Sequence, residues 1–415
     1  MNNQQISSTE ANLREIEDKV LKVYQKINPS THLLENKEIF EEHSKIRETL
    51  FRDKLKFPFE MFKDKNILDF GSGTGENCSY YLRWGANNLT CVEINNLALD
   101  RLYQLYTKWG LDKKTNIHHC SLFDFEHKGE KFDIVTCDGI LNHVEYPELG
   151  FKKLVSNLKE DGYIIISIGN TLGSFQRNLQ KYALNKLSNN KEEEIVRLAK
   201  MLFPEHIERA SKFGRRTPEA VIYDTFINPK TTNISVSEIL KWFRENEINF
   251  YSSWPPLQFP FTFVDSVNHQ FVNFENINYS NLFSFSELFW LIANKYDSET
   301  IEKNKKDLVI LSKWNEILEK MKDITPEFVL KFKLNDFSEQ FKTITPLITT
   351  LEDLNKENRE NLTLFSSEVL DFLETFDSSN DSKLIQTKIN SYKILFKGYC
   401  GLGEVFYVGY KKNNH

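Results

Sequence analysis

Short apolar runs alternate with helical patterns between residues 66 and 256 of this 415-residue chain. Leucine spacing predicts a helix over 147–159, with Leu149, Leu154 and Leu158 on one face. The predicted strands are 67–70, 89–92, 117–120, 132–137, 163–168 and 249–253. Strands that alternate with helices indicate a parallel sheet between helix layers, which binds ligands at the carboxyl ends of its strands.

A glycine-rich turn follows the first predicted strand. The sequence Gly71-Ser72-Gly73-Thr74-Gly75 comes directly after Asp69 and Phe70. Its small residues permit a tight bend and let backbone N–H groups approach a ligand closely. A dinucleotide-binding fingerprint would have glycine in place of Glu76, so the pattern argues against that class. Glu93 ends the second predicted strand, where an acidic side chain can accept hydrogen bonds from ribose hydroxyls.

Residues 67–170 resemble the class I S-adenosylmethionine-dependent methyltransferases. The resemblance lies in the glycine turn, in Glu93 and in the segment 132–143 with its terminal histidine, His143. It extends to the turn before the fifth predicted strand, although Asp161 stands where that family usually has glycine. The resemblance implies a doubly wound, seven-stranded α/β fold. It also implies S-adenosylmethionine as cofactor and S-adenosylhomocysteine as product.

The same resemblance implies roles for individual residues around the cofactor. The glycines would shape the turn, Asp69 would orient it or the cofactor's ammonium, and Glu93 would hold the ribose. Ser121 and Leu122 would flank the adenine, while Asp138 and Gly139 would lie near the methionine portion. The implied cofactor-binding residues are Asp69, Gly71, Ser72, Gly73, Gly75, Glu93, Ile94, Ser121, Leu122, Asp138 and Gly139.

His143 is the candidate general base, because the pKa of imidazole suits proton removal from a hydroxyl or amine. The alternative is a histidine that only caps the following turn. The predicted acceptor contacts are Asn142, Asn170, Arg216, Tyr223 and Asp224. For the arginine, a solvated loop position is the alternative. No metal site is expected, because the adjacent His118 and His119 point to opposite faces of a strand.

The segments on either side of this core have their own patterns. The predicted organisation is a helical lead-in or cap over 1–65, a cofactor-binding core over 66–256 with a substrate-side insertion at 171–234, a mostly helical insertion or subdomain over 257–400, and a returning C-terminal strand over 401–415. Within 257–400, a capping box at 284–287 and apolar stripes at 310–321 and 362–376 predict helices. These stripes are candidates for core packing or for a homodimer interface.

Charge and hydropathy narrow the choice of partners. The net charge of −6 and the lack of a basic stripe with interleaved aromatics argue against nucleic acid. No run of about 18 apolar residues predicts a membrane span, so a cytoplasmic location is expected. The favoured function is transfer of a methyl group to oxygen or nitrogen of a small-molecule acceptor. The alternatives are an RNA or protein methyltransferase that uses the helical insertion for recognition, and a non-catalytic scaffold.

Overall fold

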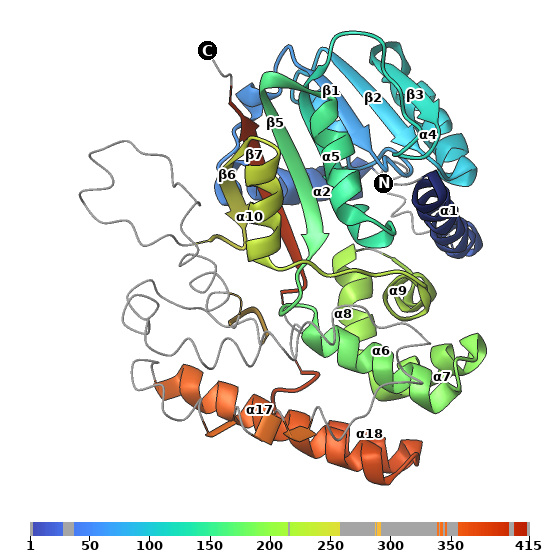
Figure 1. Cartoon of the computed structure of the whole chain (residues 1–415), viewed down its shortest axis with the longest axis vertical. Coiled ribbons are helices and arrows are strands. Elements are labelled where there is room, and N and C mark those ends of the chain that lie inside the picture. Colours follow the sequence, from blue (N-terminus) through green and yellow to red (C-terminus); the bar gives the residue numbers. More distant parts are fainter. Residues whose placement is uncertain are drawn as a thin grey trace. The chain divides into compact units, whose positions relative to one another are not determined.

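The computed structural model describes residues 3–27, 37–214, 216–257, 287, 289–291, 338–339, 341–342, 345–346, 356–397 and 402–412 (Figure 1). These residues belong to two compact units, each with its own hydrophobic core. The first unit comprises 1–168, 239–257 and 405–415, and the second comprises 169–238 and 258–404.

Among the described residues, seven strands form one sheet in the order β3-β2-β1-β4-β5-β7-β6. The strands are β1 Asn66–Phe70, β2 Asn88–Glu93, β3 Thr115–His119, β4 Phe132–Asp138, β5 Leu158–Gly169, β6 Ile248–Trp254 and β7 Glu404–Lys411. The pairs from β3 through β5 are parallel, whereas β6 and β7 are antiparallel. This order confirms the predicted doubly wound, seven-stranded α/β fold and the late return of the seventh strand.

Helices cover both faces of this sheet. The helices with residues in the first unit are α1 Asn3–Lys26, α2 Lys37–Glu48, α3 Ser79–Arg83, α4 Asn96–Trp109, α5 Pro147–Ser156 and α10 Val236–Glu245, together with a π-helical turn Thr49–Lys54 and 3₁₀ turns Phe59–Met61, Asp112–Lys114 and Leu141–His143. Side chains of α2, α3 and α4 pack in one apolar cluster with strand residues such as Ile67 and Ile134. On the other face, Phe151 of α5 stacks on Phe243 of α10 with ring centroids 5.5 Å apart (Figure 1).

The predicted helix over 147–159 is too long. Helix α5 ends at Ser156, and Leu158 instead begins β5, where it pairs with Phe132 and is fully buried. Sheet pairing and burial outweigh the helical leucine spacing at this position. The irregular register that follows contains Asp161 at φ +60, the left-handed conformation that aspartate tolerates better than most residues.

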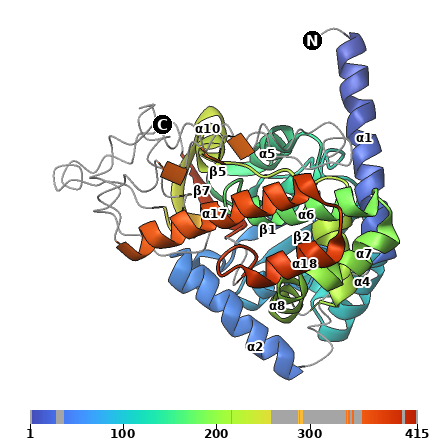
Figure 2. The same cartoon turned by 90° about the horizontal axis from the view of Figure 1, so that it is seen from below.

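In the described part of the second unit, the regular elements are helices, apart from the strand ends and an isolated bridge between Asn170 and Ile234. Its elements are α6 Phe175–Ser188, α7 Glu192–Leu202, α8 Pro204–Gly214, α9 Pro218–Ile222, a π-helical turn Tyr223–Ile227, a 3₁₀ turn Phe289–Leu291, α17 Lys356–Ser378 and α18 Ser382–Ser391. Helices α17 and α18 lie side by side, and Lys388 donates to Asp371 across them at 2.6 Å (Figure 2). No helix in the described part of the chain is long and apolar enough to cross a membrane.

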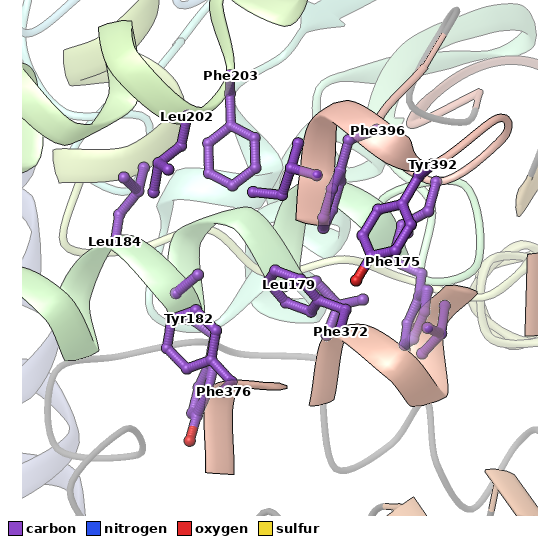
Figure 3. Packing of buried hydrophobic residues seen from close by; sticks show 14 of the residues in the cluster. Phe175, Leu179, Tyr182, Leu184, Leu202, Phe203, Phe372, Phe376, Tyr392 and Phe396 are labelled. Carbon is purple, nitrogen blue, oxygen red and sulfur yellow. The ribbon is translucent and has the colours of Figure 1, made fainter. Parts of the chain in front are cut away.

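The core of this unit joins helices that lie far apart in the sequence. Phe175 and Leu179 of α6 pack in the same cluster as Phe372, Phe376 and Phe396 (Figure 3). The apolar stripe predicted at 362–376 is therefore buried within the chain, which confirms its role as core and removes this face as a dimer interface. The predicted stripe at 310–321 and the start of the capping box at 284 lie outside the described residues.

Candidate active site

The turn after β1 has the close backbone contacts that its glycines permit. The N–H of Gly71 donates to Val92 O at 2.8 Å, and Gly71 has φ +72. A Cβ added there would lie 2.1 Å from Ile140 Cγ1, so a larger residue does not fit. Gly73 has φ +53, and a Cβ built there would meet no atom within 4 Å. The turn therefore presents open space at Gly73, where a ligand can approach the backbone.

Glu93 links the tip of β2 to this turn. Its Oε2 accepts from the N–H of Gly73 at 2.7 Å, and its Oε1 accepts from the N–H of Asn95 at 2.8 Å. Burial raises the pKa of the Glu93 carboxyl, although these backbone hydrogen bonds oppose the rise. Each carboxylate oxygen can accept more than one hydrogen bond. The two carboxylate oxygens of Glu93 can therefore still accept hydrogen bonds from the two hydroxyls of a ribose.

Further along the turn, Gly75 is held by α4. Tyr106 OH donates to Gly75 O at 2.8 Å, and a Cβ at Gly75 would lie 2.7 Å from Tyr106 Cε1. Ser72 is buried and its Oγ donates to Asp69 O at 2.9 Å. The turn is thus fixed by contacts within the fold, which orients its free backbone groups before a ligand arrives.

Two aspartates lie at the ends of the central strands. Asp69 is buried and accepts a hydrogen bond from the hydroxyl of Thr136. Burial, together with the nearby charge of Asp138, raises the pKa of Asp69 to about 6. Asp138 ends β4, and its Oδ1 accepts from Ser167 Oγ at 2.5 Å. The next residue, Gly139, has φ +72 and its N–H donates to Ser167 O at 3.3 Å.

Arg47 of α2 is a site residue that the sequence analysis missed. Its Nη1 donates to Asp138 Oδ2 at 3.2 Å, and its side chain is 9% exposed. Its Nε is buried and has no hydrogen-bond partner among the described residues. A buried guanidinium thus lies beside the carboxylate at the end of β4. No local sequence signal marks it, because its partner is 91 positions away.

Helix α1 contacts the segments that follow β2, β3 and β4. After β2, Gln25 Nε2 donates to Asn96 Oδ1 at 3.0 Å. After β3, the hydroxyl of Ser121 donates to Glu17, and Arg14 Nη1 donates to Asp124 Oδ2 at 2.9 Å. After β4, the rings of Tyr24 and His143 meet edge-on with their centroids 5.9 Å apart. Ser121 is therefore already bonded to a carboxylate of the lead-in. Leu122 is buried beside it, and Ile94 O is 3.0 Å from His119 Nε2.

Asn142 and His143 lie together in the 3₁₀ turn Leu141–His143 after β4. Both are half-buried. The Oδ1 of Asn142 is buried and has no hydrogen-bond partner among the described residues. An acceptor oxygen and an imidazole are thus adjacent at the same edge of the sheet as the glycine turn. Within the described ranges, no group of three histidine, cysteine, aspartate or glutamate side chains could hold a metal ion.

The other predicted acceptor contacts belong to the second unit. Asn170 is fully buried, and its Nδ2 donates to Glu287 Oε1 at 2.5 Å. Arg216 Nη1 donates to Asp224 Oδ2 at 2.9 Å, and the hydroxyl of Tyr223 donates to Glu192. These four residues make polar contacts inside their own unit, and their role in acceptor binding stays a prediction.

Comparisons with known proteins agree with this geometry. Residues 42–217 match the family model described as a methyltransferase domain. An uncharacterised protein of Synechococcus is 21% identical over 197 residues, and the ubiquinone biosynthesis O-methyltransferase of Shewanella pealeana is 31% identical over 120 residues. These alignments cover 44% and 28% of this chain. The chain spans about half (47%) of the length of each of these curated relatives.

Among solved structures, PKMT2 from Rickettsia typhi in complex with AdoHcy is weakly similar to this chain. It is 14% identical with a TM-score of 0.40, and the match covers 54% of this chain and 47% of that one. The match over residues 42–217 includes β1 to β5, the glycine turn and Glu93. Together with the sheet order, it shows that the chain carries a methyltransferase domain of the class I, S-adenosylmethionine-dependent type.

Proposed function

We propose that the protein is an enzyme that transfers a methyl group from S-adenosylmethionine to an oxygen or nitrogen of a small-molecule acceptor. The observation that carries the proposal is the turn at Gly73. Its N–H is held by the Glu93 carboxylate at 2.7 Å, while the space beside its α-carbon is open. The name of the Shewanella relative, a ubiquinone biosynthesis O-methyltransferase, supports an oxygen acceptor.

The residues around the turn fit the cofactor group by group. Glu93 would accept from the ribose hydroxyls. Asp69 and Asp138 would attract the ammonium of the methionine portion, and Arg47 would bind its carboxylate. When bound, the cofactor supplies an electrophilic methyl group on a positively charged sulfur, which an acceptor lone pair displaces in line. The protein's own contribution is therefore mostly placement.

The acceptor side of the proposal rests on the turn after β4. There, the imidazole of His143 would take the proton that a hydroxyl or amine loses. Asn142 Oδ1, which lacks a partner among the described residues, would accept a hydrogen bond from the acceptor. Tyr24, which meets His143 edge-on at 5.9 Å, would limit the orientations of the ring.

A calorimetric titration with S-adenosylhomocysteine, with NAD as the control ligand, tests the proposal. Wild type is expected to bind S-adenosylhomocysteine and not NAD. Gly73→Ala puts a methyl group into the open space of the turn and should abolish binding. Its matched control is Gly110→Ala at the end of α4, where φ is +67 and the added Cβ also meets nothing within 4 Å.

Both variants carry a similar backbone strain of about 1 kcal/mol, so their melting temperatures should fall alike. Only Gly73→Ala should lose the ligand. Equal binding by the two variants, or no binding by wild type, would contradict the proposal. If wild type binds, methyl transfer from labelled S-adenosylmethionine to panels of phenols, catechols and amines identifies the acceptor class.

A further inference from the structure

The cofactor's base is expected at the end of β3. Four neighbouring strands of the sheet lie in the order β4, β1, β2 and β3. Asp138, the partner of Arg47, ends β4, the glycine turn follows β1, and Glu93 ends β2. A nucleoside whose ribose is bound at the tip of β2 and whose amino-acid portion lies at β1 therefore extends its base toward β3. Ser121 lies two residues beyond the end of β3 and is buried.

A carboxylate from a distant helix lies at the same place. Glu17 of α1 accepts from the hydroxyl of Ser121, and its other oxygen, Oε2, accepts from Arg14 Nη1 at 2.9 Å. The Glu17 side chain is 11% exposed, whereas that of Asp124, also bound by Arg14, is 48% exposed. Burial raises the pKa of the Glu17 carboxyl, although the bonds from Ser121 and Arg14 oppose the rise. Glu17 is thus the more buried of the two carboxylates at the end of β3.

An acceptor at this position discriminates between purine bases. Adenine presents an exocyclic amine, which is a donor, next to an unprotonated ring nitrogen. Hypoxanthine presents an oxygen at the first position and an N–H at the second. A carboxylate has only acceptors when it is ionised, so it favours the amine and disfavours the oxygen.

We propose that Glu17 accepts a hydrogen bond from the exocyclic amine of the cofactor's adenine, so that α1 determines base specificity. The inference rests on the proposed function, and it adds a specificity-determining residue outside the family-model match, which begins at residue 42. Under this proposal, the contacts of α1 serve recognition of the adenine as well as attachment of the helix. The alternative is that Glu17 and Arg14 only attach α1 to the loop after β3.

The test compares S-adenosylhomocysteine with S-inosylhomocysteine, in which an oxygen replaces the amine. Dissociation constants for both ligands are measured by calorimetry on the full chain and on three variants. Wild type should prefer the adenine ligand by about ten-fold or more, as expected for a hydrogen bond to a charged group. In Glu17→Gln, whose amide can donate to the oxygen, this preference should fall by about ten-fold.

Two matched variants separate base recognition from helix attachment. Arg14→Ala removes the bonds to Asp124 and the bond to Glu17 Oε2 but leaves the Glu17 carboxylate and its bond from Ser121 in place, so it should weaken both ligands alike and keep the preference. Glu15→Gln changes a 61% exposed carboxylate on the same helix and should behave as wild type. A preference that is the same in Glu17→Gln as in wild type would overturn the inference and leave the proposed function standing. Failure of wild type to bind either ligand would overturn both.

Discussion

The Oε2 atom of Glu93 lies 2.7 Å from the backbone nitrogen of Gly73, 20 positions earlier in the chain. Oε1 of the same carboxylate lies 2.8 Å from the backbone nitrogen of Asn95. Glu93 therefore does two things at once, because the group expected to bind the ribose also fixes the glycine turn. Turn geometry and ribose recognition are coupled through one side chain.

The first prediction follows from this coupling. Glu93→Gln keeps one carbonyl oxygen but cannot accept from both backbone N–H groups and from two hydroxyls. We expect its affinity for S-adenosylhomocysteine to fall by about ten-fold or more, with a lower melting temperature, because a buried donor loses its partner. Titration calorimetry and thermal unfolding measure the two effects. The exposed Glu126→Gln is the control. An affinity within about two-fold of wild type would show that Glu93 only supports the turn.

A second prediction tests recognition of the cofactor's carboxylate separately from recognition of its nucleoside. Arg47→Met removes the guanidinium beside Asp138, which is 3.2 Å away. Affinity for S-adenosylhomocysteine should fall by about ten-fold or more, since its carboxylate loses a charged donor. Affinity for 5′-methylthioadenosine, which has no carboxylate, should change little. Titration with both ligands measures the difference. Equal losses for the two ligands would mean that Arg47 acts only by holding Asp138 and the fold around it.

The central strands and the glycine turn could be predicted because their signals are local. Apolar runs bounded by turns placed β1, β2 and β4 within two residues of their observed bounds. Leu158 could not be placed in this way, because its spacing from Leu154 fits a helix equally well. What decides its state is the pairing with Phe132, 26 positions earlier, and a local pattern does not contain that information.

The polar partners of the site were the least predictable part. Arg47 meets Asp138 across 91 positions, and Glu17 meets Ser121 across 104. Both come from helices that precede the glycine turn, in the region that the sequence predicts only as a helical lead-in or cap. From the sequence alone, a charged residue on such a helix is assigned to the solvent-exposed face, because its partner is identified only in the folded structure.

The third prediction concerns pH. Glu287 is fully buried, and burial raises its pKa from 4.5 to about 7. Between these values the folded chain keeps a proton that the unfolded chain has released. The stability from this carboxyl is therefore fully present below pH 4.5 and is lost as the pH rises through about 7.

Glu287→Gln should remove this dependence without removing contacts, because Asn170 and Val236 both donate to Oε1 alone. Relative to wild type, the variant should gain stability from about pH 5 to pH 8, by at most about 1.4 kcal/mol per pH unit. Urea unfolding at a series of pH values measures this. Glu357→Gln, an exposed change at the start of α17, should show no such trend. A constant difference between Glu287→Gln and wild type would refute the assignment.

The last prediction concerns the core of the second unit. The Phe372 ring lies 5.3 Å from that of Phe376 and 5.0 Å from that of Phe396, and the residue is 1% exposed. Phe372→Ala leaves a cavity among these rings and should cost about 3–5 kcal/mol of unfolding free energy. Leu364→Ala, on the same helix but 36% exposed, should cost far less. Urea unfolding followed by circular dichroism compares the two variants.

Because the glycine turn and Glu93 belong to the first unit, folded Phe372→Ala protein should keep wild-type affinity for S-adenosylhomocysteine. A titration at a temperature where the variant is fully folded measures this. Equal stability losses in Phe372→Ala and Leu364→Ala would mean that α17 adds little to the core. Loss of ligand binding in the folded variant would mean that a change in the core of the helical unit alters the cofactor site.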